Sequence, residues 1–168
     1  MNNYKEVVAI TVITFLIFFG LVWIASPKSS NQSSLAAVAE FSQNPLVSEN
    51  LKFDFGMISM ANGKVKNVFI LKNTSNDSIT ISKVFSSCMC TNAILSVGGV
   101  RRGPFGMPGH GFVPGVNENV GPGGEAQVEI VFDPAAHGPA GVGPIERTVY
   151  VETSKGVIEL EIAALVKP

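Results

Sequence analysis

Residues 51–55 read LKFDF, in which apolar and polar side chains alternate. A period of two belongs to a β-strand that buries one face and leaves the other in water. Gly56 follows directly and is expected to end the strand. Because the period changes to two at this point, we expect the folded domain to span residues 51–168.

Short strands of this kind recur along the rest of the chain. Residues 65–71 (VKNVFIL) carry apolar side chains on both faces around Phe69, as a central strand would, and the polar residues 73–77 predict a turn. Further strands are expected at 79–85, 128–132, 149–151 and 158–162. No segment after residue 50 has a helical stripe, so the pattern predicts an all-β, immunoglobulin-like β-sandwich.

Two segments rich in Gly and Pro interrupt the strand pattern. Residues 98–124 contain ten Gly and four Pro, and from this composition we expect the segment to hold no regular ladder. A connection of this length is usually either functional or disordered. Residues 134–144 have a similar composition and contain His137. We therefore expect two loops, the first of them unusually long.

A membrane anchor is predicted at the N-terminus. Residues 7–25 (VVAITVITFLIFFGLVWIA) contain no charge and would span roughly 28 Å as a helix, against about 30 Å for the hydrocarbon core. Tyr4 and Trp23 lie near the two ends, where amphipathic rings favour the interface. A cleaved signal peptide is the alternative, but its apolar core is usually about 7–15 residues. We expect residues 1–25 to form a cytoplasmic tail and a retained, single transmembrane helix.

Residues 26–50 are predicted to link the anchor to the domain. Their first part is rich in Ser, Asn and Gln, which is typical of a flexible juxtamembrane spacer. A short N-terminal tail followed by a larger folded part suits an orientation with the N-terminus inside the cell. The domain is then expected in the periplasm or outside the cell, tethered to the cell membrane by a single pass.

Composition and motifs exclude several classes of function. The net charge of −1 supplies no basic surface for nucleic acid. No serine stands in a nucleophile-elbow pattern, and the Gly-rich stretches lack the lysine and following helix of a phosphate-binding loop. Asp54 and Asp133 stand near strand ends, where they are expected to cap turns. We expect a protein that is not an enzyme.

The two cysteines stand out as candidates for chemistry. Cys88 and Cys90 flank Met89, and on an extended strand such positions face one side about 6.7 Å apart. A disulfide needs a Cβ separation of about 3.5–4.5 Å, so a bond would require a local turn and would be strained. A strained bond is easier to reduce, which suits thiol redox chemistry or metal binding better than structural cross-linking.

As metal ligands, two thiolates on one side would favour Cu(I) or Zn. The Gly/Pro segments offer further ligands of a compatible kind: Met107, His110 and His137. The competing interpretation is structural, with Cys88 and Cys90 packed as small apolar residues or bonded, and with the Met and His side chains in ordinary loop positions. We therefore expect no cofactor, with Cu(I) as the alternative.

The order of short motifs resembles the bacterial family called domain of unknown function 1573. The shared motifs are FDFG at 53–56, VKNVFILKNT at 65–74, SCMCT at 87–91, PGGE at 122–125 and VFD at 131–133. The resemblance implies an Ig-like, Hydin-related sandwich that is commonly exported and often membrane-tethered, without an established activity. Met89 stands where the family usually has Gly, and residues 101–120 form a long insertion.

The architecture is also similar to that of copper-delivering assembly factors of cytochrome c oxidase. These join one N-terminal membrane helix to an Ig-like domain and bind Cu(I) through a C-F-C-F element. Cys88 and Cys90 match its two cysteines, whereas Met89 and Thr91 replace both phenylalanines.

Our leading hypothesis is a membrane-anchored, non-enzymatic module with an interaction or structural role, whose exposed strands and 98–124 segment contact another envelope protein. A Cu(I)-binding or thiol redox protein centred on the cysteine pair is the alternative.

Overall fold

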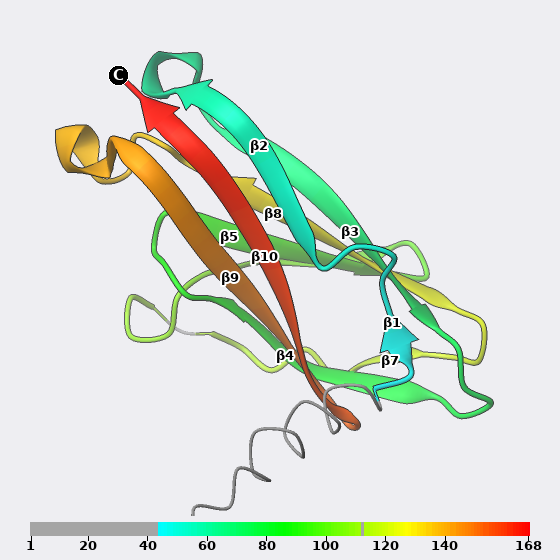
Figure 1. Cartoon of the computed structure of the whole chain (residues 1–168). Helices are drawn as coiled ribbons and strands as arrows, with labels where there is room; N and C mark the ends of the chain where they lie inside the picture. Colours follow the sequence, from blue (N-terminus) through cyan, green and yellow to red (C-terminus); the bar gives the residue numbers. More distant parts are fainter. Residues whose placement is uncertain (1–43, 112) are drawn as a thin grey trace, which may run out of the picture. The chain divides into compact units, whose positions relative to one another are not determined.

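The computed structural model describes residues 44–111 and 113–168, which form two β-sheets packed face to face (Figure 1). The predicted anchor and most of the predicted linker lie outside these residues. The strands are β1 Leu46–Val47, β2 Lys52–Ser59, β3 Val65–Asn73, β4 Ile79–Ser86, β5 Thr91–Val97, β6 Val100–Phe105, β7 Glu118–Val120, β8 Glu125–Phe132, β9 Gly143–Thr153 and β10 Gly156–Lys167. Two 3₁₀ turns, η1 at Met60–Asn62 and η2 at Gly138–Gly141, complete the elements of this part of the chain. None of its helices has the length and apolar character needed to cross a bilayer.

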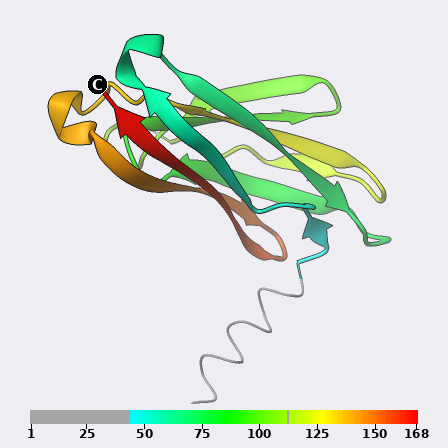
Figure 2. The ribbon, with the colours of Figure 1, turned by 45° about the horizontal axis from the view of Figure 1, so that its top comes forward.

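The strand order is that of an immunoglobulin-like sandwich. One sheet has the order β1-β3-β8-β5-β6 and the other β2-β10-β9-β4-β7. The strands correspond to A-B-E-D in the first sheet and to C-F-G, as β4-β9-β10, in the second. Figures 1 and 2 show β2, β10 and β9 side by side in one layer and β3, β8 and β5 in the other. The predicted all-β architecture is confirmed.

The core lies between the two sheets and follows the period of two. In β10 the buried positions alternate with positions that are open to solvent, as they do in β8. Each fully buried aliphatic side chain contributes about 1.5–3 kcal/mol through removal from water. The largest buried side chains are Leu46, Leu71, Ile79, Ile81, Leu95, Ile130, Leu160, Ile162, Val84, Val120, Val128 and Val149.

The strand predicted at residues 51–55 differs from expectation in two ways. β2 has no fully buried residue: it is an edge strand that pairs in parallel with β10 alone, and Phe55 and Ile58 pack only partly against the core. Gly56 does not end it: Asp54 pairs with Ala163 and Met57 with Leu165, so two residues of β2 oppose one of β10. This β-bulge uses the positive φ of Gly56, +67°, and the Asp54 carboxylate accepts a hydrogen bond from the Gly56 N–H at 2.8 Å.

β3 is not buried on both faces as predicted. Phe69 points into the core, while Val68 and Ile70 are 45% and 49% exposed. The reason is that nothing in the described part of the chain covers the outer face of this sheet at β3. β1 pairs with β3 only at Lys72 and Asn73, and it does so from within the predicted linker.

The segment 98–124 contains more regular structure than its composition predicts. β6 pairs with β5 through a tight turn at Gly98 and Gly99, both of which have positive φ. β7 pairs with β4 over Glu118–Val120. The prediction that this segment holds no ladder is therefore wrong, because two short runs pair with β5 and β4 although the segment is rich in Gly and Pro.

Candidate functional site

Cys88, Met89 and Cys90 form the turn between β4 and β5, where the chain passes from one sheet to the other. The Thr91 N–H donates to the Cys88 carbonyl at 3.1 Å and closes the turn. Below it, the buried Ser86 hydroxyl lies 2.9 Å from the Cys88 carbonyl and 2.7 Å from that of Thr91. This local geometry brings the two cysteines closer than an extended strand would.

The two cysteines are joined by a disulfide, with their Cα atoms 5.2 Å apart. That separation lies within the range of about 4.4–6.8 Å that disulfides require. The turn is held from both sides, because the Asp133 N–H donates to the Cys90 carbonyl at 2.9 Å and the Ser87 N–H donates to the Thr148 carbonyl at 2.8 Å. Asp133 also caps a turn as predicted, accepting from the Ala135 N–H at 2.9 Å.

Each sulfur has a different polar neighbour. His137, in the connection between β8 and β9, places its Nε2 atom 3.3 Å from the Cys88 Sγ atom. Arg147 of β9 donates from Nε to the Cys90 Sγ atom at 3.3 Å. The Thr91 hydroxyl lies 3.6 Å from the same sulfur. The disulfide therefore has an imidazole beside Cys88 and a guanidinium beside Cys90.

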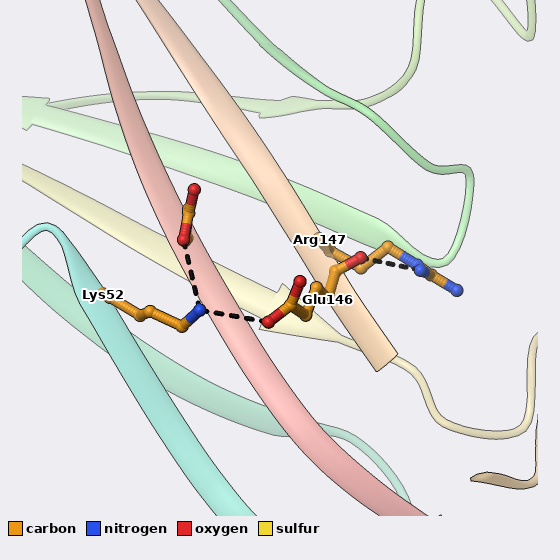
Figure 3. A network of polar contacts seen from close by, with 4 residues as sticks. Lys52, Glu146 and Arg147 are labelled. Atoms are coloured by element: carbon orange, nitrogen blue, oxygen red, sulfur yellow. Dashed lines mark hydrogen bonds and ion pairs between the residues drawn. The ribbon is translucent and has the colours of Figure 1, made fainter. Parts of the chain in front are cut away.

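Arg147 is fixed by its own strand and stands next to an ion-pair network. Its Nη1 atom donates to the Glu146 carbonyl at 2.7 Å, and the Glu146 carboxylate pairs with Lys52 of β2 at 3.1 Å (Figure 3). Lys52 also pairs with Glu161 at 3.4 Å. The hydrogen bond and negative charge of Glu146, followed by those of Glu161, raise the pKa of Lys52 above its ordinary value. The network joins β2 to β9 and β10 beside the site.

All five residues predicted as metal ligands lie at the cysteine turn or line the hollow beside it. The ligand atoms of Cys88, Cys90 and His137 are within 4.8 Å of one another. A hollow of about 400 Å³ beside them is lined in addition by Met107 and His110. These residues come from three connections that are far apart in sequence, and the fold brings them to the same end of the sandwich. The arrangement combines thiol, imidazole and thioether groups, which are soft to intermediate ligands.

Arg147 was not predicted from the sequence. It stands in a strand of mixed composition, TVYVET preceded by IER, where a basic residue on a half-exposed face is common. Only the pairing of β9 with β4 brings it beside the cysteine turn. No local motif signals this contact.

Known proteins resemble this chain in sequence over its first strands and in fold over most of its length. Residues 46–103 match the family model described as protein of unknown function (DUF1573). No curated protein matches the chain. A protein of unknown function from Porphyromonas gingivalis W83 has 14% identity and a TM-score of 0.53, over 71% of this chain and 46% of its own. The secreted serine protease VesC from Vibrio cholerae also has 14% identity and a TM-score of 0.53, over 81% of this chain and 26% of its own.

The chain thus spans less than half the length of either solved structure, and at this identity they show the fold alone. The family match includes the FDFG, VKNVFILKNT and SCMCT motifs, together with both cysteines. His137 and Arg147 lie beyond it. Over residues 46–103, the resemblance to DUF1573 that the sequence predicts is confirmed.

Proposed function

We propose that this chain is a non-enzymatic, membrane-anchored module of the cell envelope that binds another envelope protein through the open edge of β3. Residues 7–25 would anchor it, with the domain in the periplasm or outside the cell. The observation that carries the proposal is an unpaired strand edge beside a partly apolar hollow. An edge of this kind presents a row of backbone donors and acceptors to an incoming strand.

The free edge extends over most of β3. On one side, Val65–Lys72 pairs continuously with β8. On the other side, β1 pairs only at Lys72 and Asn73, so residues 65–71 have no strand partner there among the described residues. β2 does not pair with this edge, because it belongs to the other sheet. An added strand could therefore extend the sheet where β1 leaves it.

The hollow beside this edge suggests the chemistry of the partner. Its volume is about 480 Å³, and its lining includes Phe53, Val68 and Ile70, together with two lysines and two glutamates, Lys52, Lys72, Glu49 and Glu125. Apolar side chains at alternate positions of an extended segment would fit such a surface. Because the charges of the lining balance, the hollow favours no net charge on the partner. We propose an extended segment of a partner protein with apolar residues at every second position.

Site-specific photo-crosslinking tests this proposal in the full-length chain in its own membrane. A photoreactive amino acid at position Ile70 is expected to capture a discrete protein. The same residue at Val100 is the matched control, because Val100 is 45% exposed but lies on β6 at the far edge of the same sheet. Absence of an adduct at position 70, or the same adducts at both positions, would contradict the proposal.

A second candidate function is Cu(I) binding, and the convergence of Cys88, Cys90 and His137 favours it. Reduction of the disulfide would free two thiolates beside an imidazole. Met107 and His110 line the adjoining hollow and offer further ligands of suitable type. Cu(I) prefers this combination over hard oxygen ligands.

The copper candidate is tested by loading the reduced full-length protein, in detergent micelles, with Cu(I) under anaerobic conditions. About one copper per chain is expected, with loss of binding in the double variant Cys88→Ser, Cys90→Ser. His137→Gln should weaken binding in a competition with a Cu(I) chelator more than His110→Gln does. Copper that is retained by the double variant, or a protein that binds none, would exclude this function.

A further inference from the structure

The two sulfurs of the Cys88–Cys90 bond differ in access. Cys88 is 9% exposed and borders the hollow that His137 and Met107 also line. Cys90 is 1% exposed and packs with the core of the sandwich. An external thiolate must reach a sulfur atom to break a disulfide, and the side that it attacks decides which sulfur leaves. From the hollow, Cys88 is the sulfur within reach.

The surroundings of Cys90 suit the sulfur that leaves. When a disulfide breaks, the electron pair of the bond stays on the leaving sulfur, and a buried negative charge is costly unless it is paired. Arg147 already donates to the Cys90 Sγ atom at 3.3 Å, and its Nη1 bond to the Glu146 carbonyl at 2.7 Å holds the guanidinium in place. An arginine side chain keeps its charge at any pH of interest. The positive charge that would stabilise a thiolate at Cys90 is therefore already in place while the disulfide is intact.

We propose that the Cys88–Cys90 bond undergoes directional thiol–disulfide exchange with a protein that carries two neighbouring thiols. One partner thiolate attacks the Cys88 Sγ atom, a mixed disulfide forms, and the S–S electron pair moves to Cys90 as a thiolate that Arg147 stabilises. The second partner thiolate then attacks its own neighbour's sulfur in the mixed disulfide and releases Cys88. The partner is oxidised to a disulfide by two electrons, and this chain is reduced to a dithiol that takes up the two protons.

His137 stabilises the thiolate of Cys88 when the mixed disulfide is resolved. Its Nε2 atom lies 3.3 Å from the Cys88 Sγ atom, a position from which a ring N–H donates a hydrogen bond to the thiolate released there. His137 is exposed, so the partner can displace its ring during the first attack. The exchange uses the sulfurs of the copper candidate but does not rest on copper, and it goes beyond the strand-edge proposal.

The first step can be tested with reduced glutathione as the attacking thiol. Oxidised full-length protein in detergent micelles, with a metal chelator present, is pulsed with glutathione and then quenched with iodoacetamide. Tandem mass spectrometry of the 87–91 peptide locates both groups. We expect glutathione on Cys88 and the alkyl group on Cys90, with a preference on the order of tenfold over the reverse arrangement. Equal labelling or the reverse preference would overturn the proposal.

The role of Arg147 is tested by the rate at which the glutathione adduct forms in the same experiment. Arg147→Gln is expected to slow the formation of the adduct on the order of tenfold, as loss of a hydrogen bond to a charged group would. Arg147→Lys should restore part of the rate because the charge returns. Arg102→Gln is the control, since Arg102 of β6 pairs with Glu118 and is not among the residues that contact either sulfur. Equal rates for the Arg147→Gln and Arg102→Gln proteins would contradict the role. If Arg147→Gln does not fold, as judged by its thermal melt, the labelled position in the wild-type protein still decides the direction.

Discussion

At the residue scale, the FDFG motif at residues 53–56 forms an irregular part of the edge strand β2. In the structure Phe53 and Phe55 pack edge to face, with ring centroids 5.0 Å apart, on a strand without buried residues. Asp54 and Gly56 form a bulge rather than a terminus. Periodicity reveals which residues share a face, but not whether another layer covers that face.

Gly56→Ala tests the bulge. A Cβ at this position would meet nothing within 4 Å, so the cost comes from the backbone alone, through its φ of +67°. We expect destabilisation of about 1 kcal/mol, measured by urea unfolding. Gly121→Ala is the matched control, because a Cβ there also meets nothing within 4 Å and Gly121 has no positive φ. Equal stability of the two variants would show that the bulge does not need glycine.

The candidate site at this scale was predictable in part. The spacing of Cys88 and Cys90 indicates thiol chemistry, and the Gly/Pro segments supply the Met and His side chains that share the hollow. Sequence could not show which loops meet at one end of the sandwich. It also could not show that Arg147 faces Cys90, since that contact depends on the pairing of β9 with β4.

At the element scale, the strands predicted from large apolar side chains are confirmed. Strands whose side chains are small, polar or exposed were not predicted. The predictions at 65–71, 79–85, 128–132, 149–151 and 158–162 each fall within a strand of the structure. β5 was missed because its buried positions are Thr91, Ala93 and Leu95, of which only the last is strongly apolar. β6 was missed because its residues are mostly exposed and include Gly103 and Pro104. Such strands form by pairing with neighbours that sequence periodicity does not identify.

The Lys52 network leads to a prediction about pH. Its ion pairs with Glu146 and Glu161 raise the pKa of Lys52, so they stabilise the fold at neutral and alkaline pH up to 10.5 and lose this effect as pH rises through the higher pKa of the folded state. Because the pairs are exposed, the effect at pH 7 should be small and weakened by salt. Lys52→Met should lower the melting temperature slightly at pH 7, and this difference should shrink as pH rises through the raised pKa of Lys52.

Lys155→Met is a suitable control for that measurement. Lys155 lies in the turn between β9 and β10 and has no ion pair among the described residues. Its substitution should leave the melting temperature unchanged across the same pH range. A Lys52→Met difference that persists above the lysine pKa would indicate lost packing of the aliphatic stem rather than lost charge.

At the scale of the whole molecule, the sandwich has two features that its fold alone does not require. One is the free edge of β3 beside its hollow, and the other is the sulfur cluster where β4, β8 and β9 meet their connections. The first is what a strand-binding module needs, and the second offers soft metal or thiol chemistry. The immunoglobulin-like architecture was predictable because short alternating strands dominate residues 51–168. The free edge was not, because it depends on how briefly β1 pairs with β3.

Recovery of the partner with edge variants decides whether the partner binds at the β3 edge. The protein captured by crosslinking at position 70 would be co-purified with full-length wild-type, Val68→Lys and Val100→Lys chains from membranes. Val68 and Val100 are both 45% exposed, so both variants should keep the wild-type melting temperature. We predict that Val68→Lys reduces recovery on the order of tenfold and that Val100→Lys does not. Full recovery with Val68→Lys, or equal loss with both variants, would contradict binding at the β3 edge.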